Sequence, residues 1–133
     1  MAIGIAMRDV ASALISGVIV AQDDEFQLSC AQFNGGALWL PQQSATVGKS
    51  VRIRIQARDV SLSLAPQRDT SILNILPVTI IGLSEDAAGQ VMVALDAGGT
   101  PLLSRITRKS AVAMQLRPGA AIHAQIKGVA ILR

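Results

Sequence analysis

Two short runs of the sequence concentrate small hydroxyl and amide side chains, at Asp69–Leu76 and at Ser104–Ser110. A tetrahedral dianion offers only acceptor oxygens, so it binds to hydroxyls, backbone N–H groups and an ammonium. The two runs supply such donors: Thr70, Ser71, Asn74, Thr107, Lys109 and Ser110. Neither run pairs a nucleophile with a base or gathers metal ligands. They therefore indicate anion binding, and we expect no enzyme activity, no metal and no cofactor.

Both runs also have an ordinary structural interpretation. Asp69 or Thr70 can cap a turn before a strand. Residues 108–116 are rich in helix-forming residues and precede a Pro-Gly pair, so they predict a short helix whose N-cap is Thr107 or Ser110. The start of a helix presents free N–H groups and positive partial charge, which attract anions. The residues alone leave capping and anion binding as alternatives.

The charge and the aromatic content restrict the class of partner. The net charge is +3, and residues 65–133 carry the whole excess, including Lys109 and Lys127. Lys127 falls in the penultimate predicted strand, from which it could face the same anion as Lys109. A mild excess suits a small anion better than a DNA backbone, which recruits denser basic patches. With one Trp, two Phe and no Tyr, the chain lacks aromatic platforms for stacking bases, so we expect no nucleic-acid partner.

Other candidate motifs favour structural roles. Val47–Ser50 ends like a phosphate-binding loop, but it lacks the first glycine of that motif and runs into a strand instead of a helix. His123 and Cys30 each alternate within a predicted strand with no second metal ligand nearby. Asp23–Glu25 indicates a solvated turn, and Trp39 is expected to pack inside the first half of the chain.

Three features of the sequence indicate the compartment. A single cysteine excludes an internal disulfide and fits a reducing environment. No apolar stretch reaches the roughly 18–20 residues needed to cross a bilayer, and the N-terminal residues lack the order of a signal peptide. We therefore expect a cytoplasmic protein.

The chain is organised as two similar halves in which glycine turns separate short strands. Gly35–Gly36 and Gly98–Gly99 make corresponding hairpin turns, and Val51–Ala57 shows the strict apolar–polar alternation of a half-buried strand. We predict an all-β fold of two small five-stranded barrels in tandem, with one short helix in the second barrel. The predicted boundaries are a lead-in or added segment over 1–16, a first half over 17–65 and a second half over 66–133.

Four segments of the chain resemble a known family in their order and residue types. They are similar to the C-terminal region of the ATP-binding subunit of molybdate ABC transporters, and the resemblance covers nearly everything from about Gly17 to Arg133. The second half also resembles the Mop/TOBE domain, an OB-like molybdate-binding domain that occurs singly or in tandem. The four segments are Arg54–Leu64, Asp69–Leu76, Gly98–Thr107 and Ala124–Lys127.

The resemblance implies a pair of OB-like barrels that binds molybdate or tungstate at a junction between barrels, often across a dimer interface. It also implies a homodimer, with the nucleotide-binding and membrane subunits of an importer as partners at the inner face of the membrane. The chain departs from the family at Leu73, where the family has arginine. Carried over by position, the oxyanion-binding residues are Thr70, Ser71, Ile72, Asn74, Thr107, Lys109, Ser110 and Lys127.

Two functions from different classes follow. The first is a cytoplasmic regulatory domain that senses intracellular molybdate or tungstate and restrains uptake by a molybdate importer. The second is a structural dimerisation or docking module whose anion site has been lost, which Leu73 allows. Neither is an enzyme, because the sequence has no Walker A, signature or Walker B motif of the related ATPase.

Overall fold

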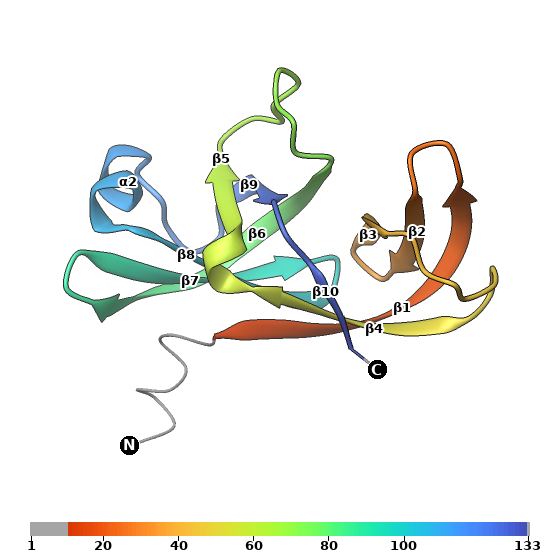
Figure 1. Cartoon of the computed structure of the whole chain (residues 1–133). Helices are drawn as coiled ribbons and strands as arrows, with labels where there is room; N and C mark the ends of the chain where they lie inside the picture. The colour runs from red at the N-terminus through yellow and green to blue at the C-terminus, as the bar shows by residue number, and fades with distance from the viewer. Residues whose placement is uncertain (1–10, 133) are drawn as a thin grey trace.

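The computed structural model describes residues 11–132, and within them nearly all regular structure is β-strand (Figure 1). This confirms the predicted all-β fold of two five-stranded units in tandem with one short helix in the second. The elements in chain order are β1 (Ser12–Asp23), β2 (Leu28–Phe33), β3 (Gly36–Pro41), β4 (Ser50–Gln56), η1 (Ala57–Asp59), β5 (Val60–Ser63), β6 (Asn74–Ala87), β7 (Gln90–Ala97), β8 (Thr100–Thr107), α2 (Arg108–Ala113), β9 (Ala121–Ile126) and β10 (Ala130–Leu132).

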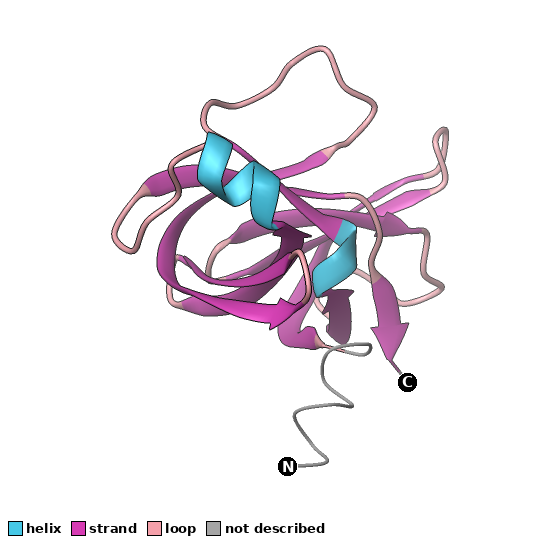
Figure 2. Ribbon diagram, turned by 90° about the vertical axis from the view of Figure 1, so that its left-hand side faces the viewer, coloured by secondary structure: helices cyan, strands magenta, loops and turns pink. Residues whose placement is uncertain are grey.

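The strands form two antiparallel sheets. The first sheet has the order β10-β4-β1-β2-β3, and the second has the order β5-β9-β6-β7-β8. The edge strands β5 and β8 of the second sheet contact each other, so that sheet curves toward a closed barrel, with α2 lying outside its strands (Figure 2). Closure of this kind protects strand edges that would otherwise be open to pairing with another chain.

The two halves of the chain exchange strands. β5 from the first half pairs with β9, with Val60 opposite Ile126. β10 from the end of the chain pairs with β4, with Ile131 opposite Ile53. The domain boundaries at 17–65 and 66–133 stay a prediction. Relative to that division, the first sheet includes β10 from the second half, and the second sheet includes β5 from the first half.

The core is aliphatic and follows the alternation of the strands. On β7 the side chains of Val91, Val93, Leu95 and Ala97 are buried, while those between them are half-buried. One hydrophobic cluster of this kind runs through both sheets. Because the side chains of a strand alternate between its two faces, the period-two pattern of the sequence was sufficient to predict these strands.

Two predictions about element ends are corrected by the structure. β1 begins at Ser12, so residues 12–16 are already strand, whereas the predicted first half began at residue 17. Ala13 and Ile15 continue the buried face of β1 and pair with Ile55 and Ile53 of β4. Residues 1–10 lie outside the described residues. Helix α2 ends at Ala113 and so is shorter than the predicted 108–116, since Gln115 adopts a positive φ of 53° that a helix cannot continue.

Ser104 on β8 is fully buried, and its Oγ donates a 2.6 Å hydrogen bond to the carbonyl oxygen of Val60 on β5. We expect Ser104→Ala to lower the free energy of unfolding by about 1–2 kcal/mol, because the buried carbonyl loses this donor. Denaturant unfolding measures the change. Ser16→Ala, on the exposed face of β1, is the control and should stay within about 0.5 kcal/mol of the wild type. Equal midpoints for the two variants would contradict the prediction.

Candidate functional site

A cleft of about 410 Å³ contains four of the predicted binding residues: Ser71, Ile72, Asn74 and Lys127. The pairing of β6 with β9 explains why they meet. Asn74 begins β6 opposite Ile126, which ends β9, so the residues before Asn74 run beside those after Ile126. Lys127 therefore lies just after its strand, where its exposed side chain reaches the same cleft as the hydroxyl-rich segment.

The segment that enters this cleft is partly shaped by local hydrogen bonds. Thr70 is not among the cleft-lining residues, and its Oγ1 accepts the N–H of Ile72 at 3.2 Å. The capping interpretation therefore describes Thr70 well. Ser71 remains exposed at the cleft, as does Leu73, a residue that is 64% exposed.

Asn74 joins the two halves of the chain. Its Oδ1 accepts the backbone N–H of Trp39 at 2.7 Å, and its Nδ2 donates to the backbone carbonyl of Trp39 at 2.9 Å. The side chain is nearly buried, and these two bonds satisfy its carbonyl oxygen and one of its N–H groups. Asn74 thus has a structural role beside the predicted binding residues.

Sequence reasoning missed Trp39, which lines this cleft together with Leu28 and Pro41 of the first sheet. The sequence placed Trp39 inside the first half of the chain. An alternating strand does show that one of its faces packs against something, but it does not show that the packing partner is the other half of the chain. No local signal could have revealed this contact.

The remaining predicted residues lie around the start of α2. Thr107 and Lys109 line a second cleft, together with Arg108 and Glu85. Thr107 is the N-cap of α2: its Oγ1 accepts the N–H of Ser110 at 3.1 Å and donates to the Ser110 Oγ at 2.9 Å. The predicted capping role of Thr107 is confirmed, and Lys109 keeps an exposed ammonium beside it.

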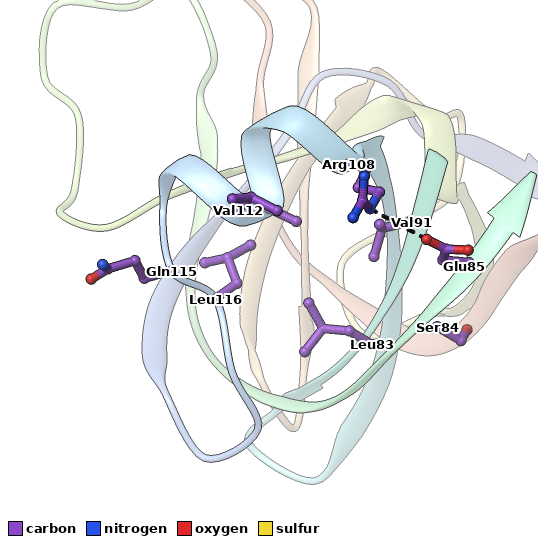
Figure 3. Close-up of a pocket in the computed structure, with 9 residues that line it drawn as sticks. Leu83, Ser84, Glu85, Val91, Arg108, Val112, Gln115 and Leu116 are labelled. Atoms are coloured by element: carbon purple, nitrogen blue, oxygen red, sulfur yellow. Dashed lines mark ion pairs between the residues drawn. The ribbon is translucent and has the colours of Figure 1, made fainter. Parts of the chain in front are cut away.

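A neighbouring groove separates α2 from the strands beneath it (Figure 3). Its floor is apolar, with Leu83, Val91 and Leu116 pointing into it, and an ion pair between Arg108 and Glu85 at 3.3 Å crosses its rim. Both charged side chains are mostly exposed, so this pair contributes little to stability. Lys109 is exposed at the start of α2 and is not among the residues that line this groove.

Six of the eight predicted residues thus fall into two groups on two different clefts, whereas Thr70 and Ser110 line neither of them. The first group combines a hydroxyl with the Lys127 ammonium, and its cleft has no carboxylate among its lining residues. The second combines the Thr107 hydroxyl with Lys109 and Arg108, beside the paired Glu85. Both groups provide donors and positive charge, which suits an anion of acceptor oxygens.

The other motifs behave as structural elements. Asp23 caps a turn by accepting the N–H of Phe26 at 3.1 Å. Burial raises the pKa of the Cys30 thiol, which lowers its thiolate fraction. Among residues 11–132, no three His, Cys, Asp or Glu side chains lie close enough together to hold a metal ion. In the same range, no helix has the length and apolar character of a membrane span.

Comparison with known proteins shows which domain and which proteins the chain is similar to. Residues 70–132 match the TOBE domain. The chain is 51% identical over 128 residues to the molybdenum import ATP-binding protein ModC of Albidiferax ferrireducens, covering 96% of this chain and 35% of that protein. It is 45% identical over 131 residues to the ModC of Pseudomonas aeruginosa, covering 96% and 36%. The chain therefore spans about a third of the length of these curated relatives.

A solved structure shares the fold over nearly the whole chain. It is the cytoplasmic molybdate-binding protein ModG, described with molybdate bound. The two superpose with a TM-score of 0.74 at 26% sequence identity, covering 89% of this chain and 93% of the other. The tandem arrangement seen here thus occurs in a protein whose described ligand is a tetrahedral oxyanion.

Proposed function

We propose that the chain, whose residues 70–132 match the TOBE domain, is a molybdate- or tungstate-binding regulatory domain of a molybdate importer. Relatives that import molybdenum and a structural neighbour that binds molybdate both support this function. The observation that carries it is the cleft that unites Ser71, Ile72 and Lys127 at the end of β9 with no carboxylate among its lining residues.

The chemistry of the ligand fits this set of donors. Molybdate and tungstate are unprotonated dianions at neutral pH, so every oxygen is an acceptor. A hydrogen bond to a charged group contributes about 1.5–3 kcal/mol. After the cost of ordering the site is subtracted, several such bonds give a binding free energy near −8 kcal/mol, which corresponds to a micromolar dissociation constant. The donors need not be crowded with cations, which agrees with the mild positive charge of the chain.

We place the complete site between two copies of the chain. The group with Ser71 and Lys127 and the group with Thr107 and Lys109 line different clefts of one chain. In a symmetric dimer the first group of one copy can face the second group of its partner. Binding then stabilises one arrangement of the two copies, because a ligand shifts an equilibrium toward the state it prefers.

This coupling suggests how the domain acts in an importer. Working on the cytoplasmic side with the ATP-binding and membrane subunits, the domain would fill its site when the internal oxyanion concentration is high. The arrangement of the two copies favoured by the anion would then restrain further uptake. No catalytic step is needed for this role.

Leu73 favours a second candidate function, a dimerisation or docking module without anion binding. Its side chain is exposed and apolar where the related family has arginine, so the cleft lacks one guanidinium. The two candidates differ in a single observable, which is whether the chain binds an oxyanion.

Isothermal titration with molybdate, tungstate and sulfate tests the proposed function. We expect micromolar dissociation constants for molybdate and tungstate, and about tenfold weaker binding after Ser71→Ala, which corresponds to one lost charge-assisted bond. Ser16→Ala, an exposed serine on β1, is the matched control and should bind like the wild type. Absence of heat with all three anions, at protein concentrations well above micromolar, would leave the structural module as the function.

A further inference from the structure

We propose that Asn74 is a positioning residue that holds Trp39 as one wall of the oxyanion cleft, so that the first half of the chain helps to build the binding site of the second. This inference rests on the proposed function. It gives a role to the first half, which has no counterpart of α2 among its described residues.

The contact between Asn74 and Trp39 has the geometry of a strand pair. β3 is the outer strand of the first sheet, so no strand among residues 11–132 pairs with its far edge. The amide of Asn74 meets this edge with both an acceptor and a donor, at 2.7 Å and 2.9 Å from the backbone of Trp39. A side-chain amide thus satisfies the backbone N–H and carbonyl that a further strand would otherwise pair with.

This contact fixes what lies across the cleft from the hydroxyl segment. Asn74 is the first residue of β6 and directly follows the Ser71–Leu73 segment, while Trp39, Leu28 and Pro41 come from the first sheet. All of them line the cleft that contains Lys127. Trp39 is half-buried. An indole held along this wall would exclude water from one side of the cleft, and hydrogen bonds to an anion are stronger where water is excluded.

The two hydrogen bonds to Trp39 also limit how many side-chain hydrogen bonds Asn74 can make to an anion. Its side-chain carbonyl oxygen and one side-chain N–H are bonded to Trp39, and the residue is only 9% exposed. Its main contribution to binding therefore passes through Trp39, whereas Ser71 and Lys127 are exposed at the cleft. This separates a positioning role for Asn74 from direct binding by those two residues.

Trp39 provides the measurement, because it is the single tryptophan in a chain without tyrosine. In the anion-free protein we expect Asn74→Ala to shift the Trp39 emission to longer wavelength, since the edge of β3 is released and the indole meets more water. In the same variant, titration with molybdate should show about tenfold weaker binding, as for one lost interaction. Gln32→Ala, which removes an exposed amide from β2, is the matched control and should change neither quantity.

The outcomes separate the alternatives. Weaker binding of molybdate with unchanged Trp39 emission would make Asn74 a direct ligand. Unchanged emission together with unchanged affinity would show that Asn74 does not position Trp39. Either result overturns the proposal. If the Asn74→Ala variant shows no cooperative unfolding, and so is not properly folded, Trp39→Phe is tested in its place. Trp39→Phe keeps both hydrogen bonds, because they use only the backbone of residue 39. This variant should bind molybdate several-fold more weakly, and wild-type affinity would overturn the role of the indole.

The test distinguishes this inference from the proposed function. The emission of the anion-free protein reports on the contact between Asn74 and Trp39 without any ligand. A wild-type protein that binds no molybdate therefore refutes the proposed function, whereas an unshifted emission in Asn74→Ala refutes only the positioning of Trp39 by Asn74.

Discussion

Gly35→Ala is expected to lower the free energy of unfolding by about 3 kcal/mol, an effect at the upper end for overpacking in a folded protein. A methyl group on Gly35 would collide with the carbonyl oxygen of Ala97 and lie 2.6 Å from Cε2 of Phe33. Ala97 is fully buried and Phe33 nearly so, and the collision involves backbone, so neither can move aside cheaply. Thermal unfolding should show a midpoint lower by roughly 10 °C.

The control is Gly82→Ala on β6. A methyl group there meets no atom of the described residues within 4 Å, and the backbone of Gly82 lies outside the positive-φ region. Its unfolding midpoint should therefore equal that of the wild type or rise slightly, because alanine restricts the unfolded chain. If Gly35→Ala unfolds at the same midpoint as Gly82→Ala, the two hairpins are not packed as closely as this structure has them.

The close contacts of Gly35 with Ala97 lie between the two halves of the chain. The turn before β3 packs against the turn after β7, where a methyl group on Gly98 would lie 3.0 Å from the carbonyl oxygen of Asn34. The sequence identified both glycine pairs as hairpin turns, which is a local property of glycine at positive φ. It did not show that one turn rests on the other, because that contact depends on how the two sheets pack.

The same distinction explains how much of the fold was predictable. The apolar–polar alternation of Val51–Ala57 was sufficient to predict a strand, since period two is decided within the segment. The assignment of β10 to the first sheet could not be predicted, because its three residues carry no signal for which sheet edge they join. Strand partners far apart in sequence are chosen by the whole core and not by either strand.

The candidate site was predictable to a similar degree. The hydroxyl segment around Ser71 was noticeable by composition, and the pairing of Asn74 with Ile126 brings it beside Lys127. The interpretation of Asn74 as a direct ligand stays a prediction, and its bonds to Trp39 could not be foreseen, since they link residues 35 positions apart. Composition thus located the donors, while tertiary packing determined what they face.

Lys127→Glu and Lys109→Glu are each expected to weaken molybdate binding at least about a hundredfold. Each replaces an exposed ammonium of one of the two residue groups by a carboxylate that repels a dianion, and such repulsion costs several kcal/mol at close range even with solvent screening. Lys49→Glu makes the same change of charge at an exposed loop lysine outside both clefts, so it should bind like the wild type.

A mixture of the two inactive variants tests whether the site is shared between copies. In a symmetric dimer each site combines the Lys127 group of one copy with the Lys109 group of the other. A mixed dimer of Lys127→Glu and Lys109→Glu then carries one doubly altered site and one wild-type site. After the two variants are unfolded and refolded together in equal amounts, about one quarter of all sites should regain wild-type affinity.

Titration calorimetry measures the recovered fraction as a stoichiometry, while the affinity of the recovered sites should equal that of the wild type. Sedimentation of each variant and of the mixture must show dimers, so that lost binding is not lost assembly. A dimeric mixture that binds no better than its separate components would place both lysines in the site of a single chain, and would refute the shared site. Recovery in the mixture alone requires that one copy supply Lys127 and its partner Lys109, which is the arrangement that would let an oxyanion control how the two copies meet.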